Sequence, residues 1–108
     1  MGSSLKPVEL HLLLALAAEP AHGYALVKRI EQDSAGRLRL LPGNLYGILH
    51  RLVEKGLVRG SRRGPAPGED QRRQYYELTA SGRRALSQEK KHLEELVGRL
   101  SSRLAESG

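Results

Sequence analysis

Residues 42–78 decide the fold: PGNLYGILHRLVEKG occupies positions 42–56, LVR follows at 57–59, and QYYEL stands at 74–78 beyond a loop rich in Arg, Gly and Pro. In the first stretch, apolar side chains recur at i, i+3, i+4 and i+7, and they are Leu45, Ile48, Leu49 and Leu52. This spacing predicts a helix with one apolar face, and Gly56 supplies the stop expected just past a helix C-terminus. The two short stretches that follow predict the paired strands of a hairpin.

The opposite face of the predicted helix carries small and hydrogen-bonding residues. Glycines allow the backbone to approach a partner closely, while Asn can hydrogen-bond adenine and Arg can fork onto guanine. Two other interpretations stay open: Asn44 suits a helix cap equally well, and Arg51 can pair with Glu54 or Glu31 on the surface. The candidate DNA-contacting residues of this helix are Gly43, Asn44, Tyr46, Gly47, His50 and Arg51.

Positive charge gathers in the hairpin after this helix. The chain carries 18 Lys and Arg against 12 Asp and Glu, a formal net charge of +6. Half of this excess lies between positions 57 and 73, where Glu69 and Asp70 stand among five arginines: Arg59, Arg62, Arg63, Arg72 and Arg73. A general basic excess can simply favour solubility, but a local basic projection suits a polyanion. We therefore predict that these wing arginines grip phosphates, which positions a protein on DNA without reading its sequence.

The part of the chain before residue 42 predicts two more helices. Residues 8–18 are apolar almost all round, and they predict a fully buried helix that ends before Pro20. A second helix should open at residues 21–24 and close at residues 34–36. Residues 37–40 then alternate Arg with Leu, which predicts a third strand beside the hairpin.

The opening of the second helix is a further candidate for DNA contact, and its residues are His22, Gly23 and Tyr24. Free N–H groups and the helix dipole favour phosphate at such a position. Tyr24 is expected to face the core first and to reach a phosphate through its hydroxyl second. In the last strand, Tyr75 and Tyr76 should point to opposite faces, because side chains alternate along a strand.

The end of the chain predicts a helix from about residue 81 to residue 105, capped by Thr79 or Ser81. Its apolar stripe has coiled-coil spacing and consists of Leu86, Leu93, Val97, Leu100 and Leu104. So short a stripe needs a partner, either a second copy or its own domain. A chain of 108 residues without Phe or Trp builds a modest core, which also favours oligomerisation. We expect a DNA-binding domain over residues 1–79 and a dimerisation helix over residues 80–108.

The composition argues against other classes of function. The chain has no cysteine, so disulfides, thiolate catalysis and Cys-based zinc sites are excluded. The histidines, which are His11, His22, His50 and His92, show no metal-binding spacing, and neither a catalytic triad nor a Walker-type loop is present. We expect no enzyme, no metal and no cofactor. The longest apolar run, residues 12–18, is too short to cross a bilayer, and without a secretory signal a cytoplasmic location is expected.

Several motifs, in their order and spacing, resemble those of PadR-type winged helix-turn-helix regulators, in the short subfamily that ends in a single helix. The motifs are His22-Gly23-Tyr24, Gly43-Asn44-Leu45-Tyr46, Lys55-Gly56-Leu57-Val58 and Arg73-Gln74-Tyr75-Tyr76-Glu77-Leu78-Thr79 with Gly82. The resemblance implies a mainly α-helical winged-helix fold with a small β-hairpin wing. It also implies a bacterial homodimeric transcription factor, most often a repressor, that binds a palindromic operator in double-stranded DNA and leaves it on binding a small-molecule effector.

Two positions depart from the pattern of that family. Its members commonly have Thr where Asn44 stands and Pro where Gly47 stands, which affects the operator sequence and leaves the docking mode unchanged. Short-subfamily members that bind planar drugs use tryptophans at the dimer pore; this chain has none, so a multidrug-sensing role is not carried over. An effector, if the protein has one, would bind between the first helix, the second helix and the partner's last helix. A winged-helix protein-interaction module and a non-specific nucleic-acid binder remain alternatives.

Overall fold

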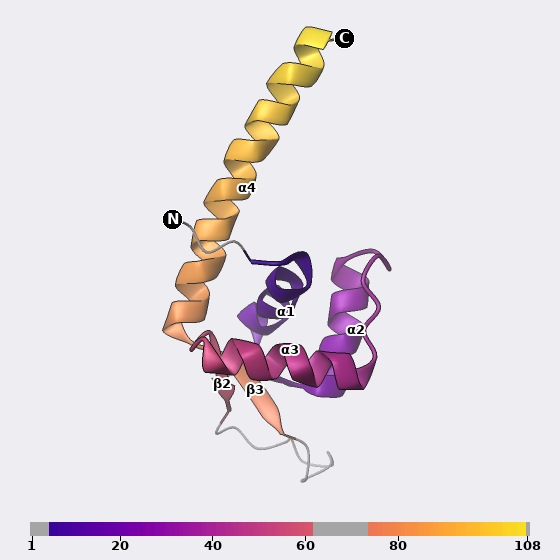
Figure 1. Cartoon of the computed structure of the whole chain (residues 1–108), viewed down its shortest axis with the longest axis vertical. Coiled ribbons are helices and arrows are strands. Elements are labelled where there is room, and N and C mark those ends of the chain that lie inside the picture. Colours follow the sequence, from indigo (N-terminus) through magenta and orange to yellow (C-terminus); the bar gives the residue numbers. More distant parts are fainter. Residues whose placement is uncertain (1–4, 62–73, 108) are drawn as a thin grey trace.

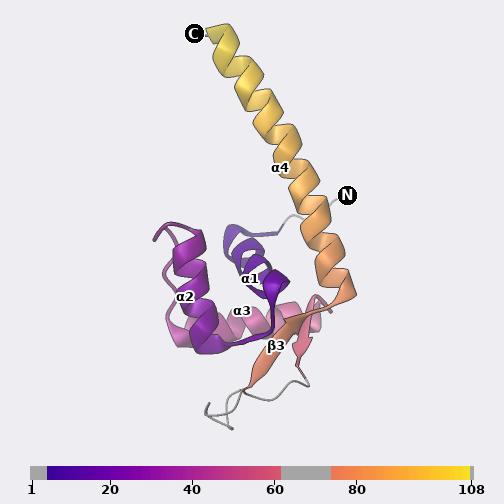
Figure 2. The ribbon, with the colours of Figure 1, turned by 180° about the vertical axis from the view of Figure 1, so that it is seen from behind.

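The computed structural model describes residues 5–61 and 74–107. Its elements are α1 (Pro7–Ala18), β1 (Ala21–His22), α2 (Gly23–Asp33), α3 (Pro42–Glu54), β2 (Val58–Gly60), β3 (Tyr75–Leu78) and α4 (Ala80–Ser107). The first three helices form a body with the small sheet beside it, and α4 extends far beyond that body (Figure 1). From both sides, α3 and the sheet lie at the opposite end of the molecule from the free end of α4 (Figure 2). The predicted winged-helix fold is confirmed.

The core is built almost entirely from aliphatic side chains of the three body helices. The fully buried large side chains are Leu12, Leu13, Leu26, Ile30, Leu45, Leu49, Leu52 and Val58. Each such side chain contributes roughly 1.5–3 kcal/mol on leaving water. Leu45, Leu49 and Leu52 share one face of α3 and are buried in this core, so the apolar stripe of the sequence fixes which face of α3 points outward.

Gly56 ends α3 as predicted. Its φ of +76° lies in the left-handed region that favours glycine. Its N–H donates to the Val53 carbonyl, and the Leu57 N–H donates to the Leu52 carbonyl, both at 3.0 Å. This pair of bonds is the Schellman motif, which satisfies helix-end carbonyls and turns the chain sharply into β2.

The third strand of the sheet is β1, and the prediction of a strand over residues 37–40 is wrong. The strand order is β1-β3-β2, with both pairs antiparallel. Residues 37–40 form an irregular connection instead, and their alternation arises because Leu38 and Leu40 pack partly against the core. Because β3 is already paired on both sides, no free sheet edge remains there for this segment.

Side chains alternate along β3 as expected, and the structure assigns the two tyrosines. Tyr76 and Leu78 pack on the core side. Tyr75 lies on the other side, where its ring meets the ring of His22 edge to face at 5.3 Å. Burial, together with the nearby Tyr46, raises the pKa of Tyr76 above its ordinary value.

Helix α1 is less buried than its sequence predicts. Leu12, Leu13 and Leu16 are in the core, but Leu14 is 48% exposed and Leu10 is only half-buried. A helix that is apolar all round is normally covered all round. One face of α1 is therefore left uncovered by the described residues.

Thr79 caps α4, one of the two caps expected. Its hydroxyl oxygen accepts the Gly82 N–H at 3.0 Å and donates to the Gly56 carbonyl at 2.6 Å, so the cap also ties α4 to the end of α3. The helix runs for 28 residues. Only its first part touches the body, where Leu86 packs against the core. No helix within the described ranges is long and apolar enough to span a membrane.

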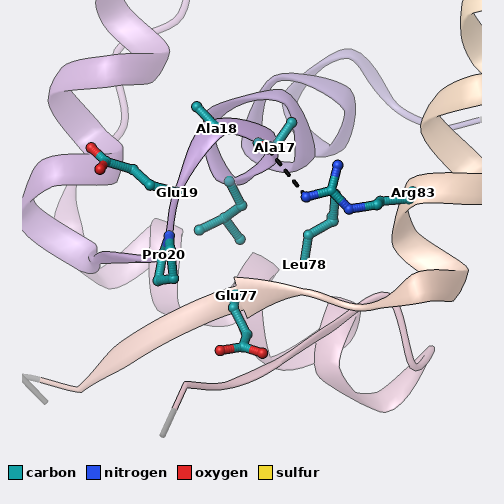
Figure 3. A pocket seen from close by; sticks show the side chains of 8 residues that line it. Ala17, Ala18, Glu19, Pro20, Glu77, Leu78 and Arg83 are labelled. Carbon is teal, nitrogen blue, oxygen red and sulfur yellow. Dashed lines mark hydrogen bonds between the residues drawn. The ribbon is translucent and has the colours of Figure 1, made fainter. Parts of the chain in front are cut away.

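A hollow of about 340 Å³ lies where the end of α1 meets β3 and α4. Figure 3 shows the Arg83 guanidinium reaching across it, where it donates to the Ala17 carbonyl at 3.4 Å. The two carboxylates beside the hollow, Glu19 and Glu77, are each engaged by another arginine at 2.7 and 2.8 Å. These contacts make the hollow a joint between elements, and they leave it little capacity for a ligand.

Glu9 joins α1 to α3 and is almost fully buried. Its carboxylate accepts the Lys6 backbone N–H at 2.9 Å and pairs with Lys55 Nζ at 3.3 Å. Burial alone would raise the pKa of Glu9, but the hydrogen bonds and positive charge from Lys6 and Lys55 outweigh it. The pKa of Glu9 is therefore lower than usual.

This lowered pKa makes Glu9 a source of acid sensitivity. Its ionised form stabilises the fold fully above its ordinary pKa, and that contribution disappears as the pH falls through the lower folded-state pKa. We expect Glu9→Gln to lose about 1–2 kcal/mol of unfolding free energy at pH 7 and much less at pH 3. Thermal melts at both pH values measure this, with the exposed Glu95→Gln as control. An equal loss at both pH values would contradict the assignment.

Candidate nucleic-acid interface

The outward face of α3 brings together the predicted DNA-contacting residues. The exposed ones are Gly43, Asn44, Tyr46, Gly47, His50 and Arg51. A Cβ added at Gly43 or Gly47 would meet nothing within 4 Å, so no packing within the described chain demands a glycine at either position. Two small residues thus leave a shallow surface between longer polar side chains, open to close approach from outside.

Asn44 is not the helix cap that its sequence context also allowed. Helix α3 begins at Pro42 with Leu41 as its N-cap, so Asn44 is the third helical residue. Its side chain is exposed and, in the described part of the chain, has no recorded hydrogen bond. The amide is therefore available to an external partner.

Arg51 is also available, because each acidic residue considered for it has another partner. Glu54 pairs with His50 at 3.2 Å, and Glu31 pairs with Arg39 at 3.4 Å. Among residues 5–61 and 74–107, no carboxylate forms an ion pair with the Arg51 guanidinium. His50 is in turn held along its own helix by Glu54, which makes it a weaker candidate for DNA contact.

Tyr46 connects α3 to the start of α2. A Cβ built on Gly23 would lie only 2.6 Å from the Tyr46 hydroxyl oxygen and 2.9 Å from the ring carbon that carries it. Gly23 is buried, whereas the Tyr46 side chain is half exposed. The glycine therefore allows the two helices to meet with Tyr46 between them, which the sequence did not reveal. Tyr46 has a packing role as well as its predicted role at the interface.

The start of α2 presents His22 and Tyr24 differently from what was expected. His22 is the N-cap, and its Nδ1 accepts the Ala25 N–H at 3.3 Å. The expectation that Tyr24 faces the core first is wrong, since the residue is 57% exposed. Its ring lies 4.7 Å from the Lys28 ammonium, one helical turn away. Leu26 takes the core position instead, and Tyr24 with Lys28 forms an outward, positively charged edge.

Of the five wing arginines predicted to bind phosphates, the structure describes only Arg59. Arg59 lies opposite Glu77 across β2 and β3, and its guanidinium pairs with that carboxylate at 2.8 Å. Its charge is therefore largely balanced before any DNA arrives. The other predicted wing residues, Arg62, Arg63, Arg72 and Arg73, lie outside the described residues.

A second exposed surface lies far from α3, along α1 and α4. A groove of about 810 Å³ runs between them, lined mainly by Leu10 and Leu14 of α1 and by Leu86, Leu93 and Val97 of α4. Beyond the groove, the free part of α4 exposes further apolar side chains, which are Leu96, Leu100 and Leu104. Leu96 flanks the stripe identified in the sequence and was not predicted. Leu86 belongs to the domain core as well as to this surface.

The described residues offer no group of three His, Asp or Glu side chains that could hold a metal ion. The site consists instead of exposed amide, hydroxyl and guanidinium groups on one helix, next to a helix N-terminus. Such groups donate hydrogen bonds to base edges and phosphates.

Comparison with known proteins agrees with this geometry. The model of the transcriptional regulator PadR-like family matches residues 12–88. A transcriptional regulator of Mycobacterium tuberculosis is 35% identical over 90 residues, covering 83% of this chain and 78% of that protein. An uncharacterised 37.1 kDa protein in a transposon of Streptomyces fradiae is 44% identical over 90 residues. That match covers 82% of this chain but only 24% of the Streptomyces protein.

Solved structures share the fold over nearly the whole chain. A PadR-like transcriptional regulator from Bacillus cereus has a TM-score of 0.75 at 22% identity, covering 90% of each chain. A PadR family transcription regulator from Clostridium difficile has a TM-score of 0.74 at 22% identity, covering 92% of this chain and 99% of that one. These relatives are regulators of transcription, not enzymes. By the extent of the family match, this chain belongs to the PadR-like family of transcriptional regulators.

Proposed function

We propose that this protein is a repressor that binds an inverted-repeat operator as a homodimer, placing α3 of each protomer in a major groove. The arrangement of α3 carries the proposal. Its four large apolar residues are buried, while Asn44 and Arg51 face outward without a recorded side-chain partner in the described structure. In this arrangement, Asn44 reads adenine, Arg51 reads guanine, and the two glycines let the helix lie deep in the groove.

The start of α2 would hold the sugar-phosphate backbone beside that groove. Its N-terminal N–H groups favour phosphate, and Lys28 adds positive charge next to Tyr24. Contacts of this kind release counterions, so binding should weaken with salt at a log–log slope near −0.9 per phosphate neutralised. The net charge of +6 also favours DNA binding that weakens as the salt concentration rises.

The second copy would cover the surface along α1 and α4. With Val97 and Leu104 at a positions and Leu93 and Leu100 at d positions, an antiparallel pair of α4 helices can align Val97 with the partner's Leu93. The same register brings Glu89 beside the partner's Arg103 on both sides of the two-fold axis. In this pairing the partner's Leu100 and Leu104 fill the groove and cover the open face of α1.

This pairing also suggests how the protein would be regulated. The groove would be shared by both copies, so a small molecule that enters it would compete with the partner helix and release the operator. The bound dimer would repress by occupying promoter DNA. Residues 1–79 then act as the DNA-binding domain and residues 80–108 as the dimerisation helix.

Single substitutions on α3 test the DNA-reading role. We expect Asn44→Ala and Arg51→Ala each to weaken operator binding about 30-fold or more, because a good bidentate contact contributes about 1–3 kcal/mol and the homodimer loses two such contacts. The operator is first selected from random-sequence DNA with the wild-type protein, and affinities are then measured by gel shift. Arg99→Ala is the matched control, since it removes the same charge from an exposed position on α4.

The results separate the alternatives. If the wild-type protein binds no duplex, a protein-interaction module replaces the proposal. Binding that is equal on selected and random DNA indicates a non-specific binder. An affinity lost equally in Arg51→Ala and Arg99→Ala would mean that α3 contributes only charge.

A further inference from the structure

Leu41 is the most exposed large hydrophobic residue in the described parts of the chain. It stands immediately before α3, and 71% of it is exposed. Its backbone is extended, with φ −79° and ψ 147°. Single exposed apolar residues are common on protein surfaces, so exposure alone does not make Leu41 functional. Its position at the start of α3 does distinguish it from the other exposed apolar residues.

Leu41 occupies the N-cap of α3, a position for which leucine is a poor choice. Its side chain forms no cap hydrogen bond. By contrast, His22 and Thr79, the caps of α2 and α4, each accept a helix N–H. Asn, Asp, Ser and Thr are strongly preferred at N-caps over Leu. The residue thus lowers local stability in two ways, by exposure and by leaving the helix without a side-chain cap, and Pro42 at the first helical position offsets only the second in part. Such incompletely compensated departures are expected at functional sites.

The surroundings of Leu41 match DNA. In helix-turn-helix proteins, the first residues of the recognition helix contact base edges, and Leu41 lies one helical turn before Asn44. The segment from Arg37 to Asn44 contains two arginines and no acidic residue. Arg39 pairs with Glu31 at 3.4 Å, whereas no ion pair of Arg37 is seen among the described residues. An exposed apolar side chain between Arg37 and Asn44 suits the one apolar feature of the major groove, the C5-methyl group of thymine.

We propose that Leu41 is a specificity-determining residue that packs against a thymine methyl group in each half-site. This inference rests on the proposed DNA-binding function and adds one contact to it. Leucine has no hydrogen-bonding group, so it would distinguish thymine from other bases through the methyl group alone.

Replacing thymine by deoxyuridine tests the contact, because uracil differs from thymine only by that methyl group. Each thymine of the selected operator is replaced in turn, symmetrically in both half-sites. For the wild-type protein we expect one position at which the replacement lowers affinity about 3- to 10-fold. For Leu41→Asn and Leu41→Ala we expect no change at that position.

Stability provides the second readout. Leu41→Asn supplies the missing cap, so its melting temperature should rise by about 4 °C or more, while Leu41→Ala should show no such rise. A thymine preference lost in a variant that melts higher than the wild type cannot come from unfolding. The inference is overturned if every replacement is neutral for the wild-type protein, or if the sensitive position stays sensitive in both variants. If the wild-type protein selects no operator at all, the proposed function itself fails.

Discussion

Gly82→Ala is expected to lose a large part of the stability of the protein. A Cβ at this position would lie 2.7 Å from Leu78 Cδ1 and still closer to the Leu57 carbonyl oxygen. The backbone oxygen cannot move without breaking the hydrogen bond that it accepts from the Thr79 N–H. Overpacking against flexible side chains already costs about 1–3 kcal/mol. Against a backbone we expect a loss of about 3 kcal/mol or more, from a total on the order of 5–15 kcal/mol.

Thermal unfolding followed by circular dichroism measures this loss, which corresponds to a fall in melting temperature of about 10 °C or more. Gly47→Ala is the matched control. Gly47 is also helical and has nothing within 4 Å of an added Cβ, so Gly47→Ala should raise stability by up to about 1 kcal/mol through helix propensity. Equal melting temperatures for the two variants would show that α4 does not dock against β3 and the Leu57 turn as described.

Val97→Asp is expected to abolish dimer formation and to reduce operator affinity at least about 100-fold. Val97 is 59% exposed, so the fold itself tolerates a polar residue there. In the proposed dimer, the aspartate would be buried opposite the partner's Leu93, and the aspartates of the two copies would lie close together beside the two-fold axis, which is strongly unfavourable. A monomer would hold one half-site only, and it would lose the large gain in affinity that comes from linking two binding sites.

Sedimentation velocity and gel shift measure the two effects on one preparation. Ser102→Asp adds the same charge five residues away, at an exposed position off the apolar stripe, and should leave both properties unchanged. A Val97→Asp protein that is still dimeric and binds the operator normally would mean that α4 is not the dimerisation surface. Loss of dimer in both variants would indicate a general effect of charge on α4.

The elements that could be predicted from the sequence are those whose signals are local. The i, i+3, i+4, i+7 stripe identified α3 and its outward face, Gly56 identified the end of α3, and the two possible caps Thr79 and Ser81 bracketed the start of α4. Each depends on residues within one or two helical turns. For the same reason the apolar stripe of α4 was visible, although the sequence alone could not show that Leu86 packs on its own domain.

The features that could not be predicted depend on contacts between distant segments. Nothing near residues 21–22 signals a strand, since β1 forms only because β3 pairs with it. The fit of Tyr46 against Gly23 likewise depends on how α2 meets α3. The pairing of Arg59 with Glu77 joins residues that are 18 positions apart. The sequence predicts that Arg59 binds phosphate, whereas its charge is largely balanced by Glu77.

The spacing of half-sites tests the central claim most directly, namely that two outward faces of α3 enter successive major grooves on one side of the duplex. Operators are prepared with the two selected half-sites at their native spacing, and with five or ten base pairs inserted between them. If the claim is right, protection footprints show two α3-dependent patches about one helical turn (roughly 34–36 Å) apart. A five-base-pair insertion, which turns one half-site to the opposite side, then removes most of the affinity. Unchanged affinity after that insertion, with Arg51→Ala still binding as the wild type does, would contradict the claim.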